Sequence, residues 1–228
     1  MSAAHPSEAR PLTLRVGENE AVSALLSVPE QARACYVFAH GAGAGMNHTF
    51  MADFAAGLAA RDVATLRFQF PYMEKGSKRP DLPALAHATV RAAVAEAARQ
   101  CPDLPLYAGG KSFGGRMTSQ AQAKAALPGV RGLVFVGFPL HPAGKPAIDR
   151  GEHLSKVAVP MLFLQGTRDE LADLALIRGV TDSLGALATL ELFDDADHSF
   201  HVRARSGGND ALVRDAMLDA TCDWIAMH

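Results

Sequence analysis

The sequence predicts an α/β protein with one mostly parallel central sheet and helices on both of its faces. Short apolar runs, typical of buried strands, alternate with longer alanine-rich runs of helical periodicity. The links between these runs are short, which favours parallel strands joined by crossover helices. The chain has 228 residues, 49% hydrophobic and 20% charged, which suits one domain with a substantial core.

The elements follow in order along the chain. Residues 1–11 are polar, with two prolines, and are expected to form a flexible tail before a single domain at 12–228. The expected strands are 12–16, 21–28, 34–39, 63–70, 104–108, 132–137, 159–165 and 188–193. The expected helices are 49–61, 85–100, 113–126, one that ends near 184, and 209–227. The first two strands form a hairpin at the antiparallel margin of the sheet, and residues 72–83 read as a surface loop.

Composition and charge exclude several classes of protein. The formal net charge of −2 gives no electrostatic basis for binding nucleic acid or an anionic membrane. No apolar run reaches the roughly 18 residues that a membrane span needs, and the first residues lack the pattern of a signal peptide. Cys35, Cys101 and Cys222 have no CxxC spacing. We therefore expect a cytoplasmic protein that needs no metal and no cofactor.

The turn from Gly110 to Gly114 matches the pattern G-x-S-x-G between an expected strand and an expected helix. Such a turn holds its serine, here Ser112, in a strained conformation with Oγ exposed, and the flanking residues must be small. A phosphate-binding loop is excluded because Pro105 stands where that motif requires glycine. The alternative is that Ser112 only caps the helix. Lys111 is expected to be a surface or packing residue.

Two more polar residues follow later strands, and the order Ser112, Asp169, His198 is that of the α/β-hydrolase triad. His198 would take the proton of Ser112, and Asp169 would orient the imidazole. Asp169 has an alternative role as a helix cap. The alternative candidates are Asp194, Asp195 and Asp197 for the acid and His201 for the base.

A glycine-rich loop begins at His40, directly after an apolar strand. Backbone N–H groups of such a loop can stabilise an oxyanion, and we assign the donors to Ala42 and Phe113, with Gly43 as the alternative to Ala42. His40 is expected to support the loop. Met46 stands where a dinucleotide-binding G-x-G-x-x-G motif requires glycine, so that reading fails.

Nearly the whole chain, from Leu12 to His228, resembles the α/β-hydrolase superfamily. Within it, the chain resembles a branch of small hydrolases that are related to dienelactone hydrolases and to the testis-expressed and NSL-complex hydrolase-like proteins. The resemblance rests on the motifs HGAGAGM (40–46), RFQFPYME (67–74), GGKSFGGRM (109–117), GFPLHPAGKP (137–146), LQGTRDEL (164–171) and DADHSFHV (195–202). The resemblance implies an α/β-hydrolase fold and the triad. Ser112 stands where dienelactone hydrolases carry a cysteine nucleophile, so their lactone substrate is not implied.

The predicted function is hydrolysis of a small carboxylic ester through an acyl-enzyme on Ser112. Residues 139–158 are too few for a cap domain, so the site is expected to be open. Tyr72, Phe138 and His141 are expected to bind the substrate as pocket walls. The same triad would also serve a serine peptidase, an acyltransferase or a thioesterase, and a non-catalytic scaffold is a further alternative. We expect a small-molecule ester as partner, and a monomer or homodimer.

Overall fold

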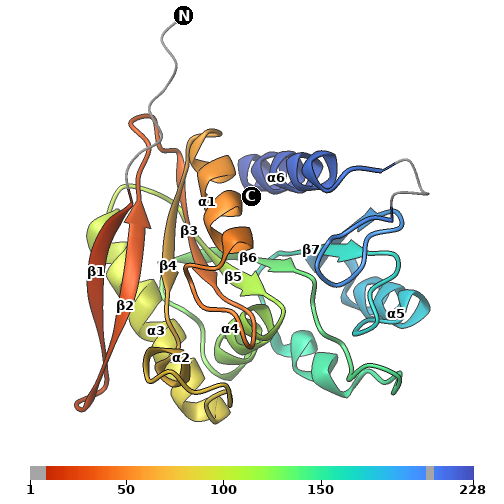
Figure 1. The fold of residues 1–228 in the computed structure, drawn as a ribbon, viewed down its shortest axis with the longest axis horizontal. Helices are drawn as coiled ribbons and strands as arrows, with labels where there is room; N and C mark the ends of the chain where they lie inside the picture. The colour runs from red at the N-terminus through yellow and green to blue at the C-terminus, as the bar shows by residue number, and fades with distance from the viewer. Residues whose placement is uncertain (1–8, 204–207) are drawn as a thin grey trace, which may run out of the picture.

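The computed structural model describes residues 9–203 and 208–228, and its centre is an eight-stranded sheet in the order β1-β2-β4-β3-β5-β6-β7-β8 (Figure 1). The strands are β1 Arg10–Val16, β2 Glu20–Ser27, β3 Ala34–Ala39, β4 Val63–Phe68, β5 Leu106–Lys111, β6 Val130–Val136, β7 Met161–Gly166 and β8 Ala188–Phe193. β1 and β2 pair antiparallel at one margin, and the strands from β4 to β8 are parallel. The predicted sheet with an antiparallel margin is confirmed.

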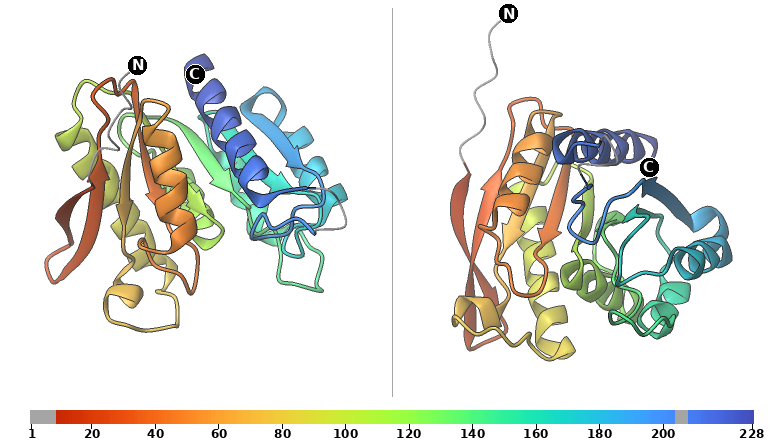
Figure 2. Two further views of the ribbon diagram at one scale, coloured as in Figure 1. Left: turned by 45° about the horizontal axis from the view of Figure 1, so that its top comes forward. Right: turned by 45° about the vertical axis from the view of Figure 1, so that its right-hand side comes forward.

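Helices cover both faces of the sheet, as predicted. One layer contains α3 Pro83–Gln100, α4 Phe113–Lys124, α5 Leu174–Leu184 and the 3₁₀ helix η1 Asp149–Lys156. The other layer contains α1 Thr49–Ala59 and α6 Asp210–Met227, which pack side by side (Figure 2). Each layer encloses its own apolar core, and the middle strands are buried on both faces, which explains their continuous apolar sequences.

Several elements differ from the sequence prediction in their bounds or in their type. Arg10 and Pro11 belong to β1 because their backbones pair with β2, and residues 1–8 of the expected tail lie outside the described residues. β5 continues to Lys111 because Gly109 and Gly110 have no side chain to separate it from its neighbours. The short helix α2 spans Pro71–Glu74, where the surface loop 72–83 was expected to begin. The link between β6 and β7 contains η1 and no cap domain.

None of the helices in the described part of the chain is both long enough and apolar enough to cross a membrane.

Candidate active site

Three polar side chains meet at the carboxyl edge of the sheet. Ser112 directly follows β5, Asp169 follows β7 and His198 follows β8, and these strands lie in the same half of the parallel sheet. Nε2 of His198 lies 2.8 Å from Oγ of Ser112, and its Nδ1 lies 2.7 Å from Oδ2 of Asp169. Because a carboxylate only accepts, Nδ1 carries the proton and Nε2 is free to accept the serine hydroxyl. The structure therefore brings together the three predicted residues.

Ser112 has the strained backbone that the motif predicts. Its φ of +48° is rare for a residue other than glycine, and such strain costs on the order of 1–3 kcal/mol. The neighbouring glycines permit this turn. A Cβ at Gly110 would lie 2.3 Å from the carbonyl oxygen of Ala39, and one at Gly114 would lie 2.5 Å from the same atom. The close approach of β3 to this turn therefore requires glycine on both sides of the serine.

His198 is held by a tight turn between residues 196 and 202. The turn is closed by an isolated bridge between Ala196 and Val202. Oδ1 of Asp197 accepts the N–H groups of Ser199 and His201 across it. These backbone contacts fix the main chain on both sides of the imidazole, so the ring can be aimed at Ser112.

Lys111 packs beside the site, in keeping with its prediction as a surface or packing residue. Its Nζ donates to the carbonyl oxygen of His198 at 2.6 Å and stands about 5 Å from the ring centroids of Phe50 and Phe200. Burial lowers the pKa of Lys111 from 10.5 to about 8, against the opposing effect of nearby Asp169 and Asp197. Lys111 thus joins the serine strand to the histidine turn.

Asp169 is buried and serves as a structural partner of the imidazole, not as a helix cap. The cap of α5 is Asp173, whose side chain accepts from the first turn. Oδ1 of Asp169 accepts the N–H of Leu171, and Oδ2 accepts from the side-chain amide of Gln165. The role of Gln165 was not predicted, although a polar residue near the end of the apolar run 161–166 was a usable signal.

The glycine-rich loop is supported by His40, as predicted. Its Nδ1–H donates to the carbonyl of Gly41, and its Nε2 accepts the N–H of Phe70. Burial lowers the pKa of His40 to about 4, so the ring stays neutral and keeps both bonds at neutral pH. Because the C=O and N–H of a trans peptide point in opposite directions, the Ala42 N–H points away from His40. The hydroxyl of Tyr72 also donates to the carbonyl oxygen of Gly41, at 3.5 Å.

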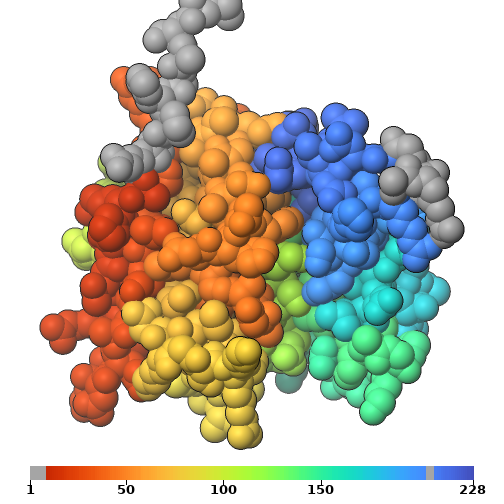
Figure 3. Space-filling model, viewed as in Figure 1, coloured from red at the N-terminus to blue at the C-terminus, as the bar shows by residue number. Residues whose placement is uncertain are grey.

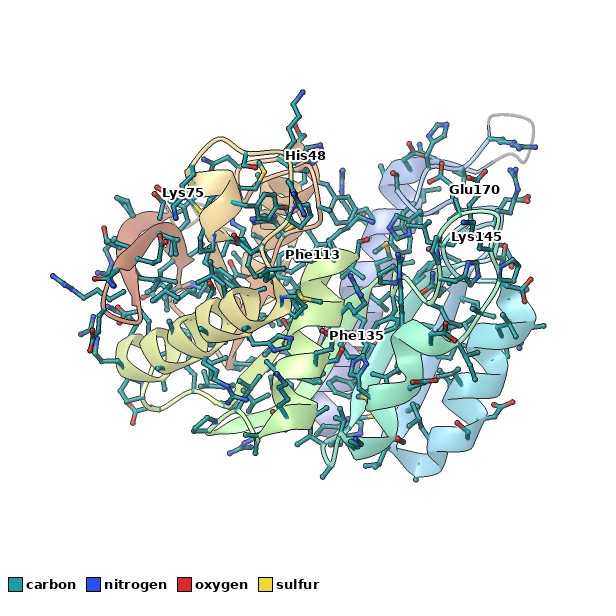
Figure 4. All side chains as sticks on the ribbon, turned by 90° about the horizontal axis from the view of Figure 1, so that it is seen from below. His48, Lys75, Phe113, Phe135, Lys145 and Glu170 are labelled. Atoms are coloured by element: carbon teal, nitrogen blue, oxygen red, sulfur yellow. The ribbon has the colours of Figure 1, made fainter. Side chains whose placement is uncertain are left out.

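Two cavities open beside Ser112. The arginine cavity, of about 350 Å³, is bordered by Ser112, Ala42, Phe113, Arg116 and Arg150 among others. The histidine cavity, of about 390 Å³, is bordered by Ser112, Ala42, Lys111, His48 and His198 among others. Figure 3 shows green atoms from the middle of the chain between the orange segment around residue 50 and the blue segment around residue 200. Figure 4 labels Phe113 at the start of α4 and His48 at the start of α1.

The three predicted substrate-binding residues are buried, and they are not among the residues that border the two cavities. Phe138 is fully buried against neighbouring phenylalanines of the core. His141 is also buried, and its Nε2 accepts the N–H of Asp173. Tyr72 is buried in α2, where it packs against Phe113. All three support the loops around the site from beneath, and the cavity walls come from other residues.

The alternative histidine and other polar groups lie apart from Ser112. His201 is exposed and pairs with Asp210 at 2.7 Å. A second Ser–His contact, from Ser119 to His153, lies in the interior, where burial lowers the pKa of His153 to about 4. Within the described residues, no group of three or more His, Cys, Asp or Glu side chains is placed to hold a metal ion.

Comparison with known proteins identifies the fold. Among solved structures, the chain is similar to a dienelactone hydrolase from Anabaena variabilis, with 18% identity, 98% of this chain and 99% of that chain covered, and a TM-score of 0.77. It is similar to XC6422 from Xanthomonas campestris, described as an α/β serine hydrolase without lid, with 22% identity, 98% of each chain covered and a TM-score of 0.73. Est1E from Butyrivibrio proteoclasticus has 16% identity, 95% and 99% coverage and a TM-score of 0.70.

At these identities the structural matches establish a shared fold, and one of the matched proteins, XC6422, is described as without lid. A family model described as "Alpha/beta hydrolase domain" matches residues 32–226, which is most of the sequence. The chain belongs to the α/β-hydrolase family.

Proposed function

We propose that this protein is a serine hydrolase that cleaves small carboxylic esters through an acyl-enzyme on Ser112. The observation that carries the proposal is the unbroken hydrogen-bonded chain from Ser112 through His198 to Asp169. A serine hydroxyl is a weak nucleophile, and this arrangement supplies both the base that activates it and the carboxylate that stabilises the resulting imidazolium.

The reaction follows from the geometry. Oγ of Ser112 attacks the ester carbonyl as Nε2 of His198 takes the hydroxyl proton. His198 then gives that proton to the departing alcohol oxygen, which leaves an acyl group on Ser112. A water molecule, deprotonated in turn by His198, attacks the acyl carbonyl, and the acid leaves as Ser112 regains its proton.

We assign the oxyanion donors to the N–H groups of Phe113 and Ala42. Phe113 is the first residue of α4, and a first-turn amide has no partner within its helix. Ala42 borders both cavities, and its N–H points away from the His40 side of the loop. Gly43, the alternative donor, is not among the residues that border the two cavities. These contacts favour Ala42 over Gly43.

The test is labelling with a fluorophosphonate together with turnover of short-chain 4-nitrophenyl esters. We expect a covalent adduct on Ser112, with loss of labelling and turnover in Ser112→Ala. Ser119→Ala is the matched control, because Ser119 also lies 2.7 Å from a histidine but is buried. Folded protein that neither labels nor cleaves any ester would instead support a non-catalytic scaffold. Faster acyl transfer to an added amine than to water would support an acyltransferase.

A further inference from the structure

Two arginines border the arginine cavity without a counter-charge. Arg116 lies one turn after Ser112 on α4, and its Nε is buried without a hydrogen-bond partner. Arg150, from η1, borders the same cavity, and its charge helps burial to lower the pKa of Arg116. Within the described residues, neither guanidinium forms an ion pair. A partly buried cation beside a second cation is a costly arrangement in the empty protein.

The surroundings add to this excess of positive charge. Arg116 lies in the first turn of α4, where the helix dipole is positive and disfavours a cation. Asp81 is the acidic residue on the cavity border, and its carboxylate accepts the N–H of Tyr72. Burial raises the pKa of Asp81, and the positive charge of Lys75 acts against this rise. Neither Arg116 nor Arg150 contributes to the pKa of Asp81, so this carboxylate does not serve as their counter-charge. An anion in this cavity would therefore meet two guanidinium groups that no carboxylate of the described residues pairs with.

The rest of the cavity border is mainly apolar. Phe113, Met117 and Pro139 contribute to it, and the guanidinium of Arg116 stands 6.0 Å from the ring centroid of Phe113. A volume of about 350 Å³ is at the small end of the range for ligand pockets. These features suit a short apolar chain that ends in an anionic group.

The position of His198 decides which half of an ester would enter this cavity. His198 protonates the departing alcohol, so the alcohol must leave beside Nε2, and His198 borders the histidine cavity. The acyl group then extends from Ser112 toward Arg116 and Arg150.

We propose that the substrate carries a carboxylate at the far end of its acyl group, held by Arg116 and Arg150, so that the acid released is a short dicarboxylate. A guanidinium matches a carboxylate by two parallel hydrogen bonds, which gives this group its specificity. The proposal rests on the ester hydrolysis proposed above and adds the class of acyl group to it.

The test compares three 4-nitrophenyl esters with the same leaving group. Their acyl groups are those of adipic acid with a free terminal carboxylate, its terminal carboxamide, and an analogue with a terminal phosphonate. We expect kcat/KM for the carboxylate to exceed that for the carboxamide by about tenfold or more, as a charge-assisted hydrogen bond allows. Arg150→Gln and Arg116→Gln should each reduce this ratio through a higher KM for the carboxylate. The control Arg99→Gln removes an exposed arginine at the end of α3 and should leave the ratio unchanged.

The outcomes separate this inference from the proposed function. Turnover of the carboxamide ester reports ester hydrolysis itself, and the ratio reports the arginine cavity. A ratio near one in wild type, a ratio unchanged in folded Arg150→Gln, or a preference for phosphonate would overturn the carboxylate assignment. If no ester is cleaved, calorimetric titration with free adipate decides the inference: binding that Arg150→Gln abolishes supports it, and absence of binding refutes it. Arg150 is half-buried and lies in η1, outside the helix that follows Ser112, so its variant keeps the test valid if Arg116→Gln fails to fold.

Discussion

Gly114, the last residue of the turn around Ser112, offers a sharp test of how that turn is built. Gly114 lies in α4 with ordinary helical dihedrals, so alanine would bring no backbone strain there. Its Cβ, however, would lie 2.5 Å from the carbonyl oxygen of Ala39 and 2.6 Å from that of His40. Both are backbone atoms that cannot rotate away, so β3 and α4 must separate. The loop that carries the Ala42 amide moves with them.

Overpacking costs about 1–3 kcal/mol, and alanine gains up to about 1 kcal/mol over glycine within a helix. With two backbone clashes we take the upper end, and expect Gly114→Ala to lower the free energy of unfolding by about 2 kcal/mol. The matched control is Gly179→Ala on α5, where an added Cβ meets no atom within 4 Å. That variant should be more stable than wild type by about 0.5–1 kcal/mol.

Urea denaturation of wild type and both variants measures these differences. In thermal melts the two variants should differ by about 6–12 °C for a chain of this length. Gly114→Ala should also lower kcat/KM about tenfold or more, because displacing a donor by about 1 Å can cost as much as 100-fold. Gly114→Ala as stable and as active as wild type would show that β3 and α4 are not in the tight contact described.

Three further predictions concern single side chains. The pKa of Lys111 in the folded protein, about 8, lies below the ordinary 10.5, so the unfolded state binds more protons between these two values. The stability of the wild type should therefore rise from about pH 8 to 10.5 relative to that of Lys111→Met, which cannot titrate there. Parallel urea midpoints for the two proteins at pH 7 and pH 10 would contradict this. His198→Ala should lose ester turnover while His201→Ala keeps it, and the reverse pattern in a 4-nitrophenyl butyrate assay would reassign the base. Asp173→Ala should cost about 1 kcal/mol by removing the cap of α5, and an unchanged urea midpoint would disprove that role.

The sequence was most informative where chemistry and periodicity coincide. Apolar runs located the strands, and Ser112, Asp169 and His198 each follow one of them, so parallel pairing was enough to predict that they meet. Their catalytic roles remain predictions for the labelling experiment. The supporting role of His40 was also predictable, since it ends a buried strand and begins the glycine-rich loop.

The walls of the site were not predictable in the same way. Tyr72, Phe138 and His141 follow strand ends too, but whether such side chains face a cavity or the core depends on how the loops fold back. Periodicity does not report this, because loops have none. The contact of Lys111 with the turn around His198 was not predictable for a related reason, because that turn lies 87 residues later in the chain.

The packing of α6 against α1 has a consequence for the order of events in biosynthesis. The side chain of Arg61 donates to Asp219 of α6, which lies 158 residues later in the sequence. The side chain of Arg214, also in α6, donates to Asp53, which lies 161 residues earlier. His198 is translated after the other two members of the hydrogen-bonded chain, and its turn is followed by α6. A ribosome-bound chain that has already folded its first strands therefore still lacks His198 beside Ser112. The hydrogen-bonded chain from Ser112 to Asp169 can form only after β8 and the turn that follows it have been synthesised.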